Sequence, residues 1–310
     1  MSTRFQNWLL FTIGTCALYL AGIFFPALVA PVTLIFSLPT AFLAFEYGSV
    51  FAMSSAVFSS LVIGVALSGS AGLLYFLSFG MPGTLMGLIA KNKPGNGNLL
   101  VASATVEFFG KLGGILLFHL FYGVNLLSPP SGTEEFKKSL MVFGASYLTA
   151  DTVNMIIDRV ILLIPYMLIL FSVLEALFCL VLLSYIHKRR TGEAVFSLPP
   201  FKSWKFPRSV LLALVVGFIC EQISSVVSGN AYLLKQMGAN LSELSRTIFV
   251  LQGLSCAYFF MEHRGIPKPM RIITVVMTPL ISFLGDIFAI VGVADIGFNF
   301  RDRKKGKLKE

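Results

Sequence analysis

Long apolar stretches with few charged residues recur along the whole chain, and they constrain its fold more than any other feature. Each is close to the roughly 20 residues that an α-helix needs to cross about 30 Å of hydrocarbon. Of the 310 residues, 56% are hydrophobic and 13% are charged, whereas soluble domains carry about 25% charged residues. The stretches are apolar on every face and lack the alternation of barrel strands. We therefore expect an all-α, polytopic transmembrane helical bundle with about eight or nine membrane spans.

A basic, proline-containing linker at residues 191–207 divides these stretches into two groups. Residues 1–190 should form a bundle of about six spans, and residues 208–300 about three more, before a basic tail at residues 301–310. Residues 126–158 differ from the spans because they begin with Ser-Pro-Pro-Ser-Gly and continue with an amphipathic pattern. This pattern predicts a helix that lies at the membrane interface or lines a wet cavity, and leaves open whether it spans the bilayer.

The net charge of +9 is concentrated at the ends of the apolar stretches. Such clusters are typical of cytoplasmic loops, and their expected partners are anionic lipid headgroups. We expect no nucleic-acid partner, because no basic stripe lies on a soluble domain. The basic clusters lie at residues 91–93, 187–190, 264–271 and 301–309.

The basic tail conflicts with a simple count of spans. If the loop at residues 91–97 is cytoplasmic, a last span at residues 272–293 would put the tail outside, although its charge favours the inside. Either this last segment is re-entrant near Pro279, Gly285 and Asp286, or the basic tail is tolerated outside.

Ionisable side chains within the apolar stretches are the candidates for a functional site, because they are costly in hydrocarbon. Glu107 and Lys111 are four residues apart and should pair on one helix face, with His119 about two turns further along. Asp151 and Asn154 follow at helical spacing and could close a ligand pocket. The same charges could instead form a neutralised pair between helices, a solvated helix face or a proton relay.

Other polar residues in the apolar stretches predict structural contacts between helices: Glu175, Glu221, Gln252 and Asp286. The cysteines have unrelated spacings within apolar segments, so we expect no disulfide framework and no metal site. The zinc-protease, P-loop and dinucleotide-binding motifs are absent. We therefore expect a protein without catalytic residues or cofactors rather than an enzyme.

Short motifs in the second half of the chain resemble the YybS-like family of predicted bacterial membrane proteins, a domain of unknown function. They begin with Leu-Pro-Pro-Phe and Trp-Lys-Phe-Pro in the linker and end with Phe-Asn-Phe-Arg. The resemblance implies a multi-pass protein of the bacterial cytoplasmic (inner) membrane. The residues that carry it are Pro199, Pro200, Trp204, Pro207, Asn230, Gln252, Gly253, Asp295, Phe300 and Arg301.

The first spans also look like the substrate-binding subunits of energy-coupling factor vitamin transporters. Those subunits contact their coupling subunit through an Ala-x-x-x-Ala sequence, which Ala17 and Ala21 match here. The further spans after residue 208 depart from that pattern. The resemblance implies a non-enzymatic subunit that binds a small molecule and works with other membrane proteins. The alternative is a membrane scaffold for an envelope, morphogenesis or division complex.

Overall fold

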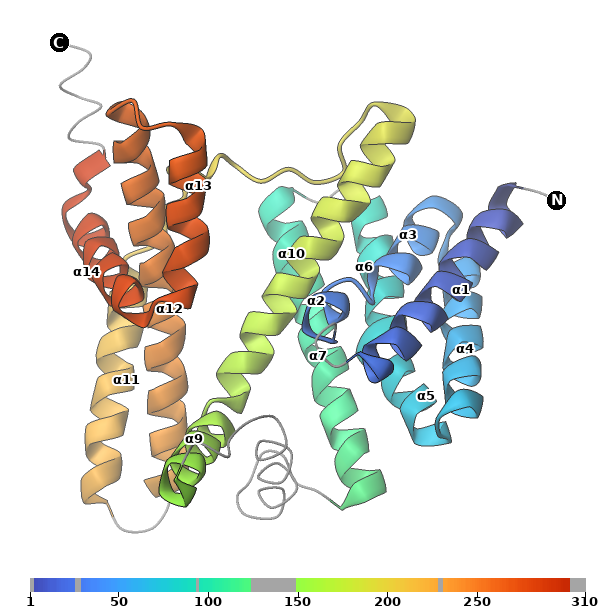
Figure 1. The fold of residues 1–310 in the computed structure, drawn as a ribbon, viewed down its shortest axis with the longest axis horizontal. Helices are drawn as coiled ribbons and strands as arrows, with labels where there is room; N and C mark the ends of the chain where they lie inside the picture. The colour runs from blue at the N-terminus through green and yellow to red at the C-terminus, as the bar shows by residue number, and fades with distance from the viewer. Residues whose placement is uncertain (1–2, 26–28, 93–94, 124–148, 228–230, 302–310) are drawn as a thin grey trace. The chain divides into compact units, whose positions relative to one another are not determined.

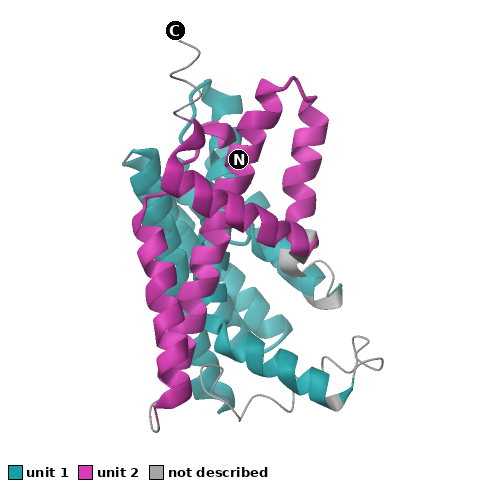
Figure 2. Ribbon diagram, turned by 90° about the vertical axis from the view of Figure 1, so that its left-hand side faces the viewer, with its two compact units in different colours: residues 1–197 teal, residues 198–310 magenta. Residues whose placement is uncertain are grey.

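The computed structural model describes residues 3–25, 29–92, 95–123, 149–227 and 231–301. All regular secondary structure in these ranges is helical, which confirms the expected all-α class (Figure 1). The chain divides into two compact units, residues 1–197 and 198–310, which Figure 2 shows in different colours. The division falls within the linker expected at residues 191–207.

The described helices of unit 1 range from 5 to 28 residues in length. A short π-helical segment, η2, joins α5 to α6, so that residues 69–91 form one continuous helical span. The bounds are α1 (Thr3–Phe24), α2 (Val29–Thr33), α3 (Leu38–Tyr47), α4 (Ser49–Ala66), α5 (Gly69–Tyr75), η2 (Phe76–Gly80), α6 (Met81–Lys91), α7 (Asn96–Tyr122), α9 (Ala150–Leu162) and α10 (Ile164–Thr191).

Unit 2 starts with the linker and is built around one long helix. Its bounds are η4 (Phe201–Ser203), α11 (Ser209–Val226), α12 (Ala231–His263), α13 (Lys268–Met277), η5 (Thr278–Leu280) and α14 (Ser282–Phe298).

Six of the described helical segments are long and apolar enough to cross a membrane. With α1, which has 22 residues, and the shorter apolar segment Pro31–Tyr47, they agree with the expected polytopic bundle. Large apolar side chains point away from the protein on these helices, for example Val65, Leu120 and Val226. Lipid hydrocarbon is the environment that such surfaces need.

The last expected span, residues 272–293, is not one continuous helix. The helix breaks at η5, where Pro279 lies and Ile281 adopts an extended conformation. Within unit 2, α13 runs away from the end of α12 and α14 turns back toward it (Figure 1). Arg246 and Ser255 of α12 contact Asp286 and Arg301, respectively, so α12 and α14 are parallel and end on the same side of the unit.

This hairpin favours the re-entrant alternative for the final segment. Arg271 at the start of α13 and Lys202 in the linker both pair with Glu262 near the end of α12, at 3.2 Å and 2.8 Å. Arg301 lies at the same end of the unit, where it contacts the backbone carbonyl of Lys202. The last described residue, Arg301, therefore lies on the side of the other basic segments of unit 2, which is the arrangement that the positive-inside rule favours.

Most of the amphipathic segment expected at residues 126–158 lies outside the described residues. Its described end is α9, which Thr149 caps at the N-terminus by accepting a hydrogen bond from the backbone of Thr152 at 3.3 Å. α9 buries Val153 and Ile157 and exposes its polar face, so this part is amphipathic as predicted. The helix ends at Leu162, and α10 begins at Ile164 with Pro165 in its first turn.

Glycines set the distance between α12 and α14. A side chain at Gly253 would collide with the backbone carbonyl of Phe288, and one at Gly292 would collide with that of Phe249. Small residues of this kind let two helix backbones approach closely in lipid. The motif residue Gly253 therefore has a packing role.

Candidate functional site

A buried cluster of three charged side chains joins α7 to α10 in unit 1. Lys111 donates a hydrogen bond to Glu107 Oε2 at 3.1 Å, one helical turn away, and a second one to Glu175 Oε2. The four-residue spacing places Glu107 and Lys111 on one face of α7, which packs against α10. The cluster therefore consists of one ammonium group between two carboxyl groups.

The side chains of the cluster are almost completely buried. Glu107 is 0% exposed, and the side chains of Lys111 and Glu175 are 13% and 4% exposed. Among the described residues, nothing donates to Glu107 Oε1 or pairs with the hydroxyl of Ser103, one turn earlier on α7, although both atoms are buried. Buried polar atoms without partners are uncommon, and a bound proton, water or ion is one of the explanations for them.

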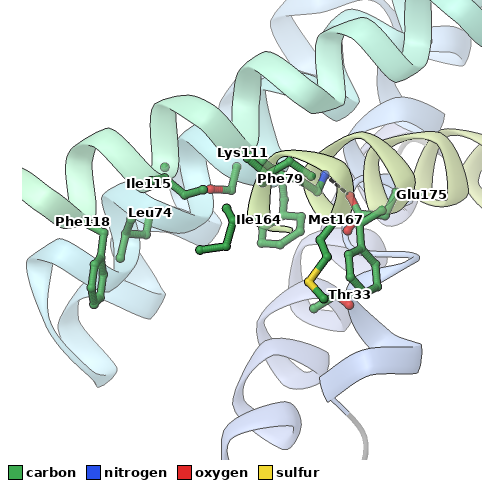
Figure 3. Close-up of a pocket in the computed structure, with 13 residues that line it drawn as sticks. Thr33, Leu74, Phe79, Lys111, Ile115, Phe118, Ile164, Met167 and Glu175 are labelled. Atoms are coloured by element: carbon green, nitrogen blue, oxygen red, sulfur yellow. Dashed lines mark hydrogen bonds and ion pairs between the residues drawn. The ribbon is translucent and has the colours of Figure 1, made fainter. Parts of the chain in front are cut away.

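A cavity of about 610 Å³ lies beside the cluster. Its walls come from α5, η2, α7 and α10, with Thr33 of α2, and they are mostly apolar side chains such as Ile115, Phe118 and Met167 (Figure 3). Lys111 and Glu175 are its charged residues, and their side chains meet at its wall. Binding pockets commonly have this volume and combine apolar walls with a few convergent polar groups.

The structure brings only part of the predicted ligand-binding set to this cavity. Glu107 and Lys111 lie in the cluster, but His119 is exposed at the last turn of α7 and does not line the cavity. It follows Lys111 by eight residues, which turns it about 80° around the helix. Asp151 and Asn154 are exposed on α9, whose apolar face is the buried one, and they are not in the cavity wall either.

Glu175 is the member of the site that the sequence analysis treated as a structural residue. Its sequence signal is a lone acidic residue in a strongly apolar helix, which must find a cation inside the protein. Lys111 is the matching cation on another span, but spacing along the chain does not reveal contacts between helices.

Metal ligation receives no support from the residues that the structure describes. They contain no group of three or more histidine, cysteine, aspartate or glutamate side chains that could hold a metal ion. Cys16, Cys179, Cys220 and Cys256 are all free thiols.

A second buried cluster, in unit 2, surrounds Arg301. Its Nε and Nη2 donate to Asp295 Oδ2 at 3.0 and 2.7 Å, and Nη1 donates to the hydroxyl of Ser255 at 2.9 Å. The carbonyls of Lys202 and Trp204 accept from Nη1 and Nη2 at 2.9 and 2.8 Å. These contacts use all five N–H groups of the guanidinium.

The other motif residues of unit 2 complete this network. Gln252 donates to Asp295 Oδ2 at 2.5 Å and accepts a hydrogen bond from the backbone of Phe206 at 3.0 Å. Trp204 donates from its indole to the carbonyl of Pro199 at 3.0 Å. The motifs therefore attach the linker to α12 and α14. Pro200 and Pro207 are exposed in the linker, Phe300 is 38% exposed, and Asn230 lies outside the described residues.

The remaining polar residues have structural contacts. Glu221 of α11 packs against Gly238 of α12, and Asp286 accepts a hydrogen bond from Arg246 at 2.6 Å. Arg246 also pairs with Glu243 at 3.5 Å, one turn earlier on α12.

Comparison with known proteins supports the family resemblance. The family model described as "Predicted membrane protein (DUF2232)" matches residues 14–296, which include the cluster of unit 1 and most of unit 2. The uncharacterized protein YybS of Bacillus subtilis (strain 168) is 28% identical over 121 residues. That alignment covers 38% of this chain and 37% of the relative. No solved structure matches the chain. Since the family model spans most of its length, the chain belongs to the DUF2232 family of predicted membrane proteins.

Proposed function

We propose that the protein is a non-enzymatic membrane subunit that binds a small, largely apolar molecule in unit 1. The observation that carries this proposal is the cavity of about 610 Å³ with Lys111 and Glu175 on its wall. Apolar walls favour an apolar ligand body, while an ammonium and a carboxyl group can orient one polar group of that ligand. The cluster would therefore bind the polar group of the ligand, at one end of the cavity.

We propose that this ligand binding serves transport across the membrane. The resemblance to substrate-binding subunits of energy-coupling factor transporters supports it, and so does Ala17, which is exposed on α1 and open to contact with another subunit. Residence in a bacterial cytoplasmic membrane is part of the proposal, and the similar Bacillus subtilis protein supports it. The P-loop motif is absent from the sequence, so this chain would not energise transport by its own ATP hydrolysis.

The test is native mass spectrometry of the protein extracted from its own host in mild detergent. Ile115 lines the cavity, whereas its neighbour Leu116 is 52% exposed and does not. Ile115→Trp should obstruct part of the cavity, and Leu116→Trp is the control with a matching change on the next residue. We expect a bound molecule at unit stoichiometry in the wild type and in Leu116→Trp, and its loss in Ile115→Trp.

Two results would count against a binding subunit. The first is equal occupancy of the two tryptophan variants, which would place the bound molecule elsewhere. The second is a wild-type protein that arrives empty but carries other envelope proteins, which would favour the scaffold alternative.

A further inference from the structure

We infer that the Glu107–Lys111–Glu175 cluster holds one exchangeable proton, shared between its two carboxyl groups. This inference goes beyond ligand binding, because it concerns the resting charge of the cluster and applies to an empty cavity as well. It follows from the composition of the cluster, its burial and the free atoms of its side chains.

The first step is a count of charges. If all three groups were ionised, two carboxylates and one ammonium would leave one negative charge without a counterion. Glu107 is 0% exposed and Glu175 is nearly so, so both carboxyl groups are largely removed from the solvent that would stabilise that charge. A buried ion without a partner is strongly unfavourable, and such groups normally change protonation instead. One added proton makes the cluster neutral.

The second step concerns the neighbours that could supply a positive charge. Lys111 is already shared by both carboxyl groups. From η2, the ring of Phe79 lies 5.8 Å from Lys111 Nζ, and on α10 the buried thiol of Cys179, one turn after Glu175, donates to the carbonyl of Leu34 at 3.5 Å. The apolar core around Cys179 is formed by residues such as Phe42, Met86 and Leu180. These neighbours provide no second cation.

The third step distinguishes a proton from a metal cation. A hard metal cation needs several oxygen ligands around it, and the described residues contain no suitable group of metal-binding side chains. A proton needs one oxygen atom. The buried Oε1 of Glu107, which has no hydrogen-bond partner among the described residues, is such an atom. Because the two carboxyl groups are coupled through Lys111, the proton belongs to the pair rather than to one of them.

Infrared difference spectroscopy of the full-length protein in detergent at neutral pH tests this inference. Carbon-13 labelling of glutamate identifies the carbonyl stretch of a protonated carboxyl group. We expect Glu107→Gln and Glu175→Gln each to lose this signal by the amount of one group, because either leaves a neutral pair with Lys111. Glu262→Gln is the control, since Glu262 pairs with Lys202 and Arg271 at the end of α12, and it should leave the signal unchanged.

Each alternative outcome overturns the inference. Persistence of the signal in both single variants would place the protonated group elsewhere. Its absence from the wild type, together with a melting temperature that rises with sodium chloride but not with choline chloride, would show a metal cation in place of the proton. Absence of the signal without any cation dependence would show that the cluster tolerates a net charge.

Gel filtration identifies folded variants, and either glutamine variant alone is sufficient. None of these results depends on whether a ligand occupies the cavity, so failure here and failure of the proposed function are separable.

Discussion

Replacement of Lys111 by methionine removes the cation that both buried carboxyl groups share. Methionine has a similar length and fits irregular apolar surroundings, so the change in packing should be small. Removal of one partner from a buried ion pair typically costs about 3–5 kcal/mol, because the remaining charge is left without compensation. Lys111 is 13% exposed, so solvent screening reduces this figure little. We therefore expect the free energy of unfolding to fall by about 3–5 kcal/mol.

The matched control is Lys202→Met, which makes the same chemical change at an exposed pair. The side chains of Lys202 and Glu262 are 45% and 38% exposed, and exposed ion pairs contribute about 0–1 kcal/mol. Reversible unfolding in mixed micelles, followed by circular dichroism while the fraction of denaturing detergent is raised, gives both free energies. If Lys111→Met and Lys202→Met agree within about 1 kcal/mol, the reasoning about a buried, charge-coupled cluster is wrong.

Three further predictions concern unit 2. Arg301→Met should lower the free energy of unfolding by about 3–5 kcal/mol, because it leaves Asp295 buried without its cation. Arg264→Met, at an exposed position, should change it by about 0.5 kcal/mol or less. Equal effects of the two substitutions in the same micelle assay would contradict a buried network. Gly253→Ala should lower the free energy of unfolding by about 1–3 kcal/mol, because the added carbon forces α12 and α14 apart. Gly297→Ala, where the added carbon meets no neighbour, should leave the free energy of unfolding unchanged or raise it. The opposite order of the two effects would refute the close contact between the helices. A fluorescent protein fused after residue 310 should be active in the cytoplasm and an alkaline phosphatase fused there should be inactive, and the reverse pattern would show that the final segment crosses the membrane once.

The sequence predicts the membrane spans well because a single physical requirement, burial of about 20 apolar residues, determines them. It also predicts the pairing of Glu107 with Lys111, since residues four apart on a helix are neighbours. Glu175 shows the limit of this reasoning. It is 64 residues from Lys111 along the chain, and only the packing of α7 against α10 brings the two side chains together.

The differences between the sequence predictions and the structure also have physical causes. His119 was included with Glu107 and Lys111 because it lies about two turns further along the helix, but eight residues do not complete whole turns. For the final apolar segment the sequence leaves a single span and a re-entrant segment open. Its hydropathy is continuous, and only the structure shows that the helix is interrupted at Pro279 and the extended Ile281. Motif residues in the linker, α12 and α14 were recognisable, yet their shared contact with Arg301 depends on the fold of unit 2.

The two buried clusters differ in a way that assigns them different roles. Around Arg301 one positive and one negative side chain balance, and every guanidinium N–H has a partner, although Asp295 Oδ1 is buried without a hydrogen-bond partner among the described residues. Around Lys111 the charges do not balance, Glu107 Oε1 has no hydrogen-bond partner among the described residues, and a cavity reaches the cluster. The clusters therefore differ in charge balance and in the adjoining cavity: a balanced ion pair can serve as an attachment, whereas an unbalanced cluster beside a cavity can accept a proton or a ligand. The chemistry of this protein should therefore be sought at Lys111, and Arg301 should be regarded as the residue that holds the linker in place.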